Sequence, residues 1–79
     1  MSYVQVEYDE EADAIAIHFE EPRGEVLTED FGNERYVDYD ETGKVVGVEF
    51  LGVSQGISLE GLPEAERIKR ALNAIPHPV

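Results

Sequence analysis

The sequence predicts an α+β domain, in which one C-terminal helix packs on one face of an antiparallel sheet of four to five strands connected as hairpins or a meander. Two observations predict this fold: segments of alternating apolar and polar residues fill 3–51, and one segment of helical periodicity occupies 62–75. A glycine-bearing connector, 52–61, separates them, and 76–79 forms a tail. At 79 residues, we expect 1–79 to form a single small domain of marginal stability.

The expected strands alternate in the manner of half-buried strands. In 14–20, for example, Ile15, Ile17 and Phe19 alternate with Ala14, Ala16 and His18. The acid-rich segment 25–31 is the weakest of them and is expected at an edge. The five segments are 3–8, 14–20, 25–31, 34–39 and 44–51.

The turn between the first two strands, 9–13, contains Asp9 and Asp13, and an aspartate can bond its own backbone two residues further on. Asp9 and Asp13 are therefore expected to have a structural role in this turn.

The stretch "VDYDETGKVVGVEFL", 37–51, has two interpretations. Asp38, Asp40, Gly43 and Glu49 fit a calcium-binding loop, although Thr42 is a weak ligand at its fifth position. That loop needs a helix on each side, and both flanks here favour strands. A type I turn over 40–43, with Gly43 at positive φ in a bulge, explains more. We therefore predict a hairpin, with Asp38, Asp40 and Glu49 as weak metal candidates only.

Two further features support the hairpin. Asp40 and Gly43 belong to its turn, and Gly47 allows a bulge or a close backbone approach within the second strand.

The helix predicted at 62–75 begins with Pro63 at its first position, where the missing N–H costs nothing. The early Glu66 and the later Arg70 suit the helix dipole. Pro76 ends the helix. The apolar stripe consists of Ala65, Ile68, Leu72 and Ile75. One helix covers one sheet face only, and the small-residue face of 14–18 is a candidate for cover by the helix or by another subunit.

The charge is strongly acidic, with 18 acidic and 6 basic residues and a net charge of −12. The whole imbalance lies in 1–41. Contacts to phosphates or to anionic lipids need clustered Lys and Arg, so nucleic acid and membranes are not expected partners. An acidic surface suits a basic protein partner. The chain has no cysteine, no signal-peptide pattern and no apolar run of membrane-spanning length, so a cytoplasmic location is expected.

No catalytic residue and no cofactor is predicted. His18 and His77 are the two histidines, and neither accompanies a nucleophile at a spacing typical of a catalytic triad. We expect His77 to be solvated and leave the role of His18 open. The acids of 9–13 are expected to form a solvated turn, because a raised carboxyl pKa needs burial.

Two motifs resemble those of the YuzE-like family of small bacterial domains of unknown function. The first is "VEYDEEADAIAIHF", 6–19, and the second is "YVDYDETGKVVGVEFLGVS", 36–54. The resemblance covers roughly 3–54 and implies a small β-rich cytosolic domain without an established activity. Some such domains look like the antitoxin halves of toxin–antitoxin pairs.

The function expected from these observations is a non-enzymatic protein–protein interaction module, antitoxin-like toward a basic partner. The alternative is a metal-dependent or carboxylate-based enzyme. A homodimer is expected, because 45–51 offers apolar residues to both faces of the sheet and one helix covers a single face.

Overall fold

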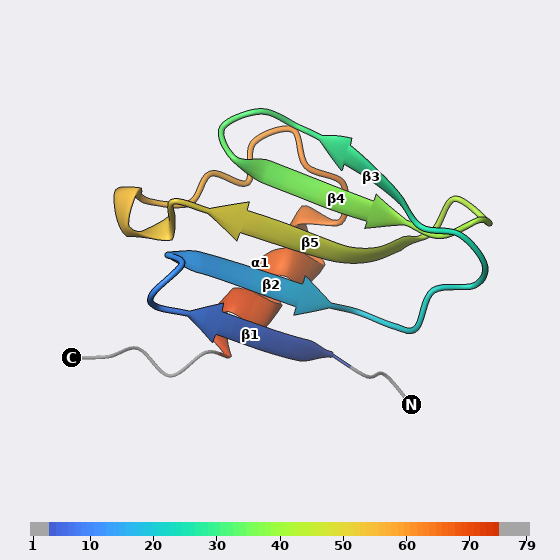
Figure 1. Ribbon diagram of the computed structural model, residues 1–79, viewed down its shortest axis with the longest axis horizontal. Helices are drawn as coiled ribbons and strands as arrows, with labels where there is room; N and C mark the ends of the chain where they lie inside the picture. The colour runs from blue at the N-terminus through green and yellow to red at the C-terminus, as the bar shows by residue number, and fades with distance from the viewer. Residues whose placement is uncertain (1–3, 75–79) are drawn as a thin grey trace.

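The computed structural model describes residues 4–74, which form a five-stranded antiparallel sheet and one α-helix (Figure 1). This confirms the predicted α+β class and the antiparallel sheet. The strands are β1 (Gln5–Asp9), β2 (Ala14–His18), β3 (Leu27–Asp30), β4 (Arg35–Tyr39) and β5 (Val45–Leu51). A short 3-10 helix, η1 (Val53–Gln55), and the helix α1 (Ala65–Asn73) follow.

The strand order is β1-β2-β5-β4-β3, so β1 and β3 lie at the two edges. The β1–β2 hairpin and the β3–β4–β5 meander join where β2 pairs with β5. The connection from β2 to β3 therefore crosses to the far edge of the sheet, as Figure 1 shows. The edge position expected for 25–31 is the one that β3 occupies.

One side of the sheet carries the hydrophobic core, and we call it the core face. Ile17, Val48 and Val37 are paired neighbours on β2, β5 and β4, and each is 1% exposed or less. Ile68 and Ala71 of α1 belong to the same buried cluster. In Figure 1 the helix runs behind β1, β2 and β5. The alternation of β2 therefore places Ile15 and Ile17 on the core face, in this cluster, while Ala14, Ala16 and His18 lie on the opposite side, the open face.

The hairpin between β4 and β5 has the turn that its sequence predicts. The N–H of Gly43 donates to the carbonyl of Asp40 at 2.9 Å, and the N–H of Asp40 donates to the carbonyl of Lys44 at 2.9 Å. Gly43 has a φ of 86°, which a side chain with a Cβ rarely adopts.

A bulge follows this turn, because Tyr39 pairs with Val45 while Asp38 pairs with Gly47. The shift places Val45 on the core face with Tyr39, inside the buried cluster. The expectation that Val45 shares a face with Gly47 and Leu51 is thus wrong, because the bulge changes the alternation at this point. Beyond the bulge, β5 presents Gly47, Glu49 and Leu51 to the open face.

The helix begins later than predicted. Glu64 has a φ of 57° and caps α1, so Pro63 precedes the helix and is not its first residue. The left-handed backbone at Glu64 interrupts helical geometry, and a turn closed by the Leu62 N–H and the Leu59 carbonyl lies before it. Ile68 of the predicted stripe is fully buried, and Ala71, outside that stripe, is buried beside it. The predicted positions of Ile75, Pro76, His77 and the tail lie outside the described residues.

Within residues 4–74, no helix has both the length and the apolar character that crossing a membrane requires.

Candidate functional site

The open face of the sheet gathers carboxylates around small residues. The register aligns Glu7, Ala16, Glu49 and Tyr36 across β1, β2, β5 and β4. Because directly paired residues share a face, Glu7 and Glu49 lie on either side of Ala16. Strands lie about 4.8 Å apart, so about 10 Å separates the backbones that carry these two acids.

The next row of the open face continues the same pattern. Gln5, His18, Gly47, Asp38 and Thr28 align across all five strands. Gly47 is buried, and a Cβ at that position would lie 3.0 Å from the backbone carbonyl oxygen of Ile17. The glycine therefore permits the close approach of β2 to β5, as the sequence suggests, and it leaves the middle of the row without a side chain.

The open-face carboxylates, a name we use for Glu7, Asp38 and Glu49, are little engaged in holding the fold. Glu7 lies 3.5 Å from Nε2 of His18, and both side chains are largely exposed. Asp38 accepts a hydrogen bond from the hydroxyl of Thr28 on β3. Glu49 is exposed at the centre of the sheet. The face can thus present negative charge to a ligand without breaking buried contacts.

Asp40 differs from these acids because it is buried in the turn. Its Oδ1 accepts bonds from the N–H and hydroxyl of Thr42 and from the N–H of Lys44, and its Oδ2 accepts from the N–H of Arg23. The Thr42 hydroxyl and these N–H groups lower the pKa of Asp40 to about 2, against an opposing effect of desolvation. Asp40 therefore holds the turn and the segment at Arg23 together.

The two aspartates of the first motif also bind local backbone. Oδ1 of Asp9 accepts a bond from the N–H of Ala12 at 3.0 Å within the turn. Asp13 has a φ of 55°, and its carboxylate accepts bonds from the N–H and hydroxyl of Ser54 at 2.9 and 2.7 Å. Asp13 thus fixes η1 against the β1–β2 turn, a long-range role that the local turn pattern did not predict.

The weak metal candidates do not form one cluster. Asp38 and Glu49 are on the open face in adjacent rows, while Asp40 lies past the end of β4 with its oxygens bonded to the turn. Among residues 4–74, no group of three or more His, Cys, Asp or Glu side chains is placed to hold a metal ion.

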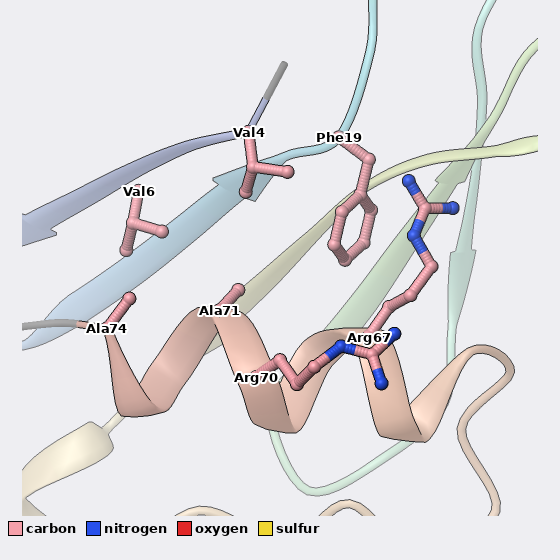
Figure 2. A pocket seen from close by; sticks show the side chains of 7 residues that line it. All are labelled: Val4, Val6, Phe19, Arg67, Arg70, Ala71 and Ala74. Atoms are coloured by element: carbon pink, nitrogen blue, oxygen red, sulfur yellow. The ribbon is translucent and has the colours of Figure 1, made fainter. Parts of the chain in front are cut away.

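A groove of about 450 Å³ lies on the other side of the sheet, between β1 and α1 (Figure 2). Arg67 stacks on the ring of Phe19, with 4.4 Å from its guanidinium carbon to the ring centroid. The polar side chains in its lining are two arginines, so the lining offers cationic and apolar contacts but neither a carboxylate nor an imidazole for acid–base chemistry. The lining consists of Val4, Val6, Phe19, Arg67, Arg70, Ala71 and Ala74.

Arg35 is a structural residue that sequence reasoning missed. It is only 7% exposed, and its guanidinium donates to the backbone carbonyls of Phe31, Gly32, Ser58 and Glu60. It therefore joins the β3–β4 turn to the connector before α1. An arginine opening a strand gives no local signal for this role, because its partners at 58–60 are distant in sequence.

The pKa of Tyr39 is also shifted, and Glu29 contributes to the shift. Burial raises the pKa of Tyr39, and the neighbouring Glu29 carboxylate raises it further by its charge and by a hydrogen bond. Both residues belong to the paired strands β3 and β4, on the core face.

Comparison with protein families matches residues 5–54 to a family described as a protein of unknown function (DUF2283). The matched region spans all five strands and ends in η1. Neither the curated proteins nor the solved structures gave a match.

Proposed function

Because the chain belongs to the DUF2283 family of proteins of unknown function, we propose its role from its own geometry: a non-enzymatic module that binds a basic protein through the open face. One observation carries the proposal, namely that the open-face carboxylates border a floor of small residues: Glu7 and Glu49 flank Ala16, and Asp38 lies beside Gly47. Lysine and arginine side chains of a partner can reach the carboxylates while their aliphatic parts lie on this floor.

The different compositions of the two sheet faces, one apolar and one charged, support this role. In the proposal, α1 packs on the core face and closes the hydrophobic cluster, so that folding does not require cover on the open face. The charge then serves recognition, because it steers a basic partner toward the sheet and disfavours acidic competitors.

Several finer expectations stay predictions. They are the YuzE-like identity, the antitoxin-like form of the module, its bacterial origin and its cytoplasmic location. The alternative of a metal-dependent or carboxylate-based enzyme also stays a prediction.

Affinity capture with matched variants tests the proposal. The wild type is immobilised beside a triple variant, Glu7→Gln, Asp38→Asn and Glu49→Gln, and both are exposed to an extract of the native host. We expect the wild type to retain a basic protein that the triple variant loses, because three charge-assisted contacts disappear. The purified partner should then bind the wild type at least about tenfold more tightly, a difference of about 1.4 kcal/mol.

The control is a second triple variant, Glu11→Gln, Glu60→Gln and Glu66→Gln, which changes the net charge equally at exposed acids outside the open face. It should retain the partner at nearly wild-type affinity. Equal losses of affinity in both triple variants would show that net charge alone causes the effect. Undiminished binding by the first triple variant would refute the open face as the binding site. Thermal unfolding of each variant confirms that the fold is intact.

A further inference from the structure

The edge strand β1 exposes apolar side chains where the sheet ends. Val4 and Tyr8 are each 45% exposed, and Val6 between them is half-buried. By alternation all three lie on the core face, and Val4 and Val6 line the groove beside α1 in Figure 2. Exposed apolar residues at a sheet edge are typical of a surface that another strand covers.

The backbone of β1 is oriented to accept such a strand. The N–H of Phe19 donates to the carbonyl of Val46 at 2.8 Å, so the odd-numbered residues of β2 bond to β5 and the even-numbered ones bond to β1. Their partners on β1 are Gln5, Glu7 and Asp9. The N–H and C=O groups of Val4, Val6 and Tyr8 therefore point away from β2, toward the outer edge.

We propose that a second copy of the chain occupies this edge, with the two β1 strands antiparallel about a two-fold axis through Val6, which makes one continuous ten-stranded sheet. This register sets Val4 opposite the partner's Tyr8 and Gln5 opposite the partner's Glu7. It pairs Val6 with the partner's Val6 through their outward backbone groups. A two-fold axis at Glu7 would instead place the two Glu7 carboxylates opposite each other, which is unfavourable.

The charges near the groove complement this arrangement. Gln5 pairs with His18, so Val4, one residue before Gln5, lies beside Phe19, one residue after His18. Arg67 stacks on the ring of this Phe19. In the proposed register, the partner's chain continues past its Tyr8 into its acidic turn 9–13 at this same end. Arg67 and Arg70 therefore face that turn, and they supply local attraction between two chains that are each strongly negative.

The opposite edge fits a second copy less well. β3 has four residues, Leu27–Asp30, of which Glu29 and Asp30 are both acidic. Pairing two β3 strands would place several carboxylates near one another in a short strand. Leu27 is nevertheless 71% exposed, which makes it a suitable control for accessibility.

Cysteine cross-linking tests the register directly, because the chain contains no cysteine of its own. Val6→Cys should form a covalent dimer on mild oxidation with diamide, since paired residues of antiparallel strands lie about 5.5 Å apart between Cα atoms, within disulfide range. Leu27→Cys is the control for random collisions. At a protein concentration of about 100 μM, the preformed pair should react at least about tenfold faster than this control.

Two further variants separate this register from others. Val4→Cys alone and Tyr8→Cys alone should cross-link slowly, whereas their mixture should give the mixed dimer. Circular dichroism checks that each variant folds, and sedimentation gives the mass without oxidation. A monomer mass at hundreds of micromolar, or Val6→Cys reacting no faster than Leu27→Cys, would overturn the proposal. Of the open-face carboxylates only Glu7 lies on β1, and the pairing involves neither Asp38 on β4 nor Glu49 on β5, so either result leaves the binding of a basic partner to be judged separately.

Discussion

At the scale of single residues, the acids of this chain divide into those that hold the fold and those that are free to bind. Asp13 and Asp40 accept two and four hydrogen bonds respectively, and they hold η1 and the β4–β5 turn in place. The open-face carboxylates make few such contacts. The distinction depends on long-range geometry, because all of these residues look alike as acids in a polar stretch of sequence.

The lowered pKa of Asp40 predicts a specific pH dependence. Its ordinary pKa is 3.8 and its folded value is about 2, so its contribution to stability is complete above the ordinary value and is lost as the pH falls toward about 2. Asp40→Asn should lower the stability at neutral pH and also remove this part of the acid sensitivity. Urea unfolding of the wild type and Asp40→Asn between about pH 2 and about pH 6 measures this acid sensitivity. If the free energies of unfolding of the two proteins vary with pH in parallel, the lowered pKa of Asp40 is contradicted.

At the scale of elements, the sequence predicted each strand within a few residues and the turn between β4 and β5, but not the order of the strands in the sheet. Alternation identified β2 and β5, and Gly43 identified the turn, because these signals are local. The bulge at Val46, the insertion of β5 between β2 and β4, and the buried Arg35 depend on contacts distant in the chain. The helix start was misplaced because Pro63 suits both a first helical position and the residue before a cap.

The hairpin turn predicts a cost for any side chain at Gly43. Gly43→Val should reduce the free energy of unfolding by about 1–2 kcal/mol, because a β-branched residue is strained at positive φ. Glu41→Val places the same residue in the same turn at a position without positive φ and should cost less. Chemical denaturation compares the two, and an unchanged stability of Gly43→Val would show that the turn is wrongly assigned.

The connector before α1 depends on Arg35. Arg35→Met should destabilise the protein by about 2–3 kcal/mol, because it removes charge-assisted bonds to four carbonyls in a mostly buried site. Arg35→Lys keeps the charge but has fewer hydrogen-bond donors, so its stability should lie between those of the wild type and Arg35→Met. In Arg35→Met, amide hydrogen exchange should become faster first at 56–62. Uniform loss of protection across the sheet, without faster exchange at 56–62, would contradict the role of Arg35 in holding the connector.

At the scale of the whole molecule, a net charge of −12 opposes self-association while the apolar edge of β1 favours it. The repulsion is long-ranged, and salt reduces its range from about 30 Å at 0.01 M to about 10 Å at 0.1 M. Burial of apolar surface acts at contact and survives this change. We therefore expect dimerisation to strengthen as salt rises over this range. Sedimentation across a salt series measures it, and weakening with salt would mean that the attraction of Arg67 and Arg70 for the acidic turn dominates.

The central claim is that the open face binds a basic partner while the core face holds the fold. Mapping of amide chemical shifts on addition of the captured partner tests it most directly. The account predicts that the largest changes fall on Glu7, Ala16, Tyr36, Gly47 and Glu49, which share the open face across four strands. Changes confined to α1 and the groove, with the open-face residues unmoved, would contradict it.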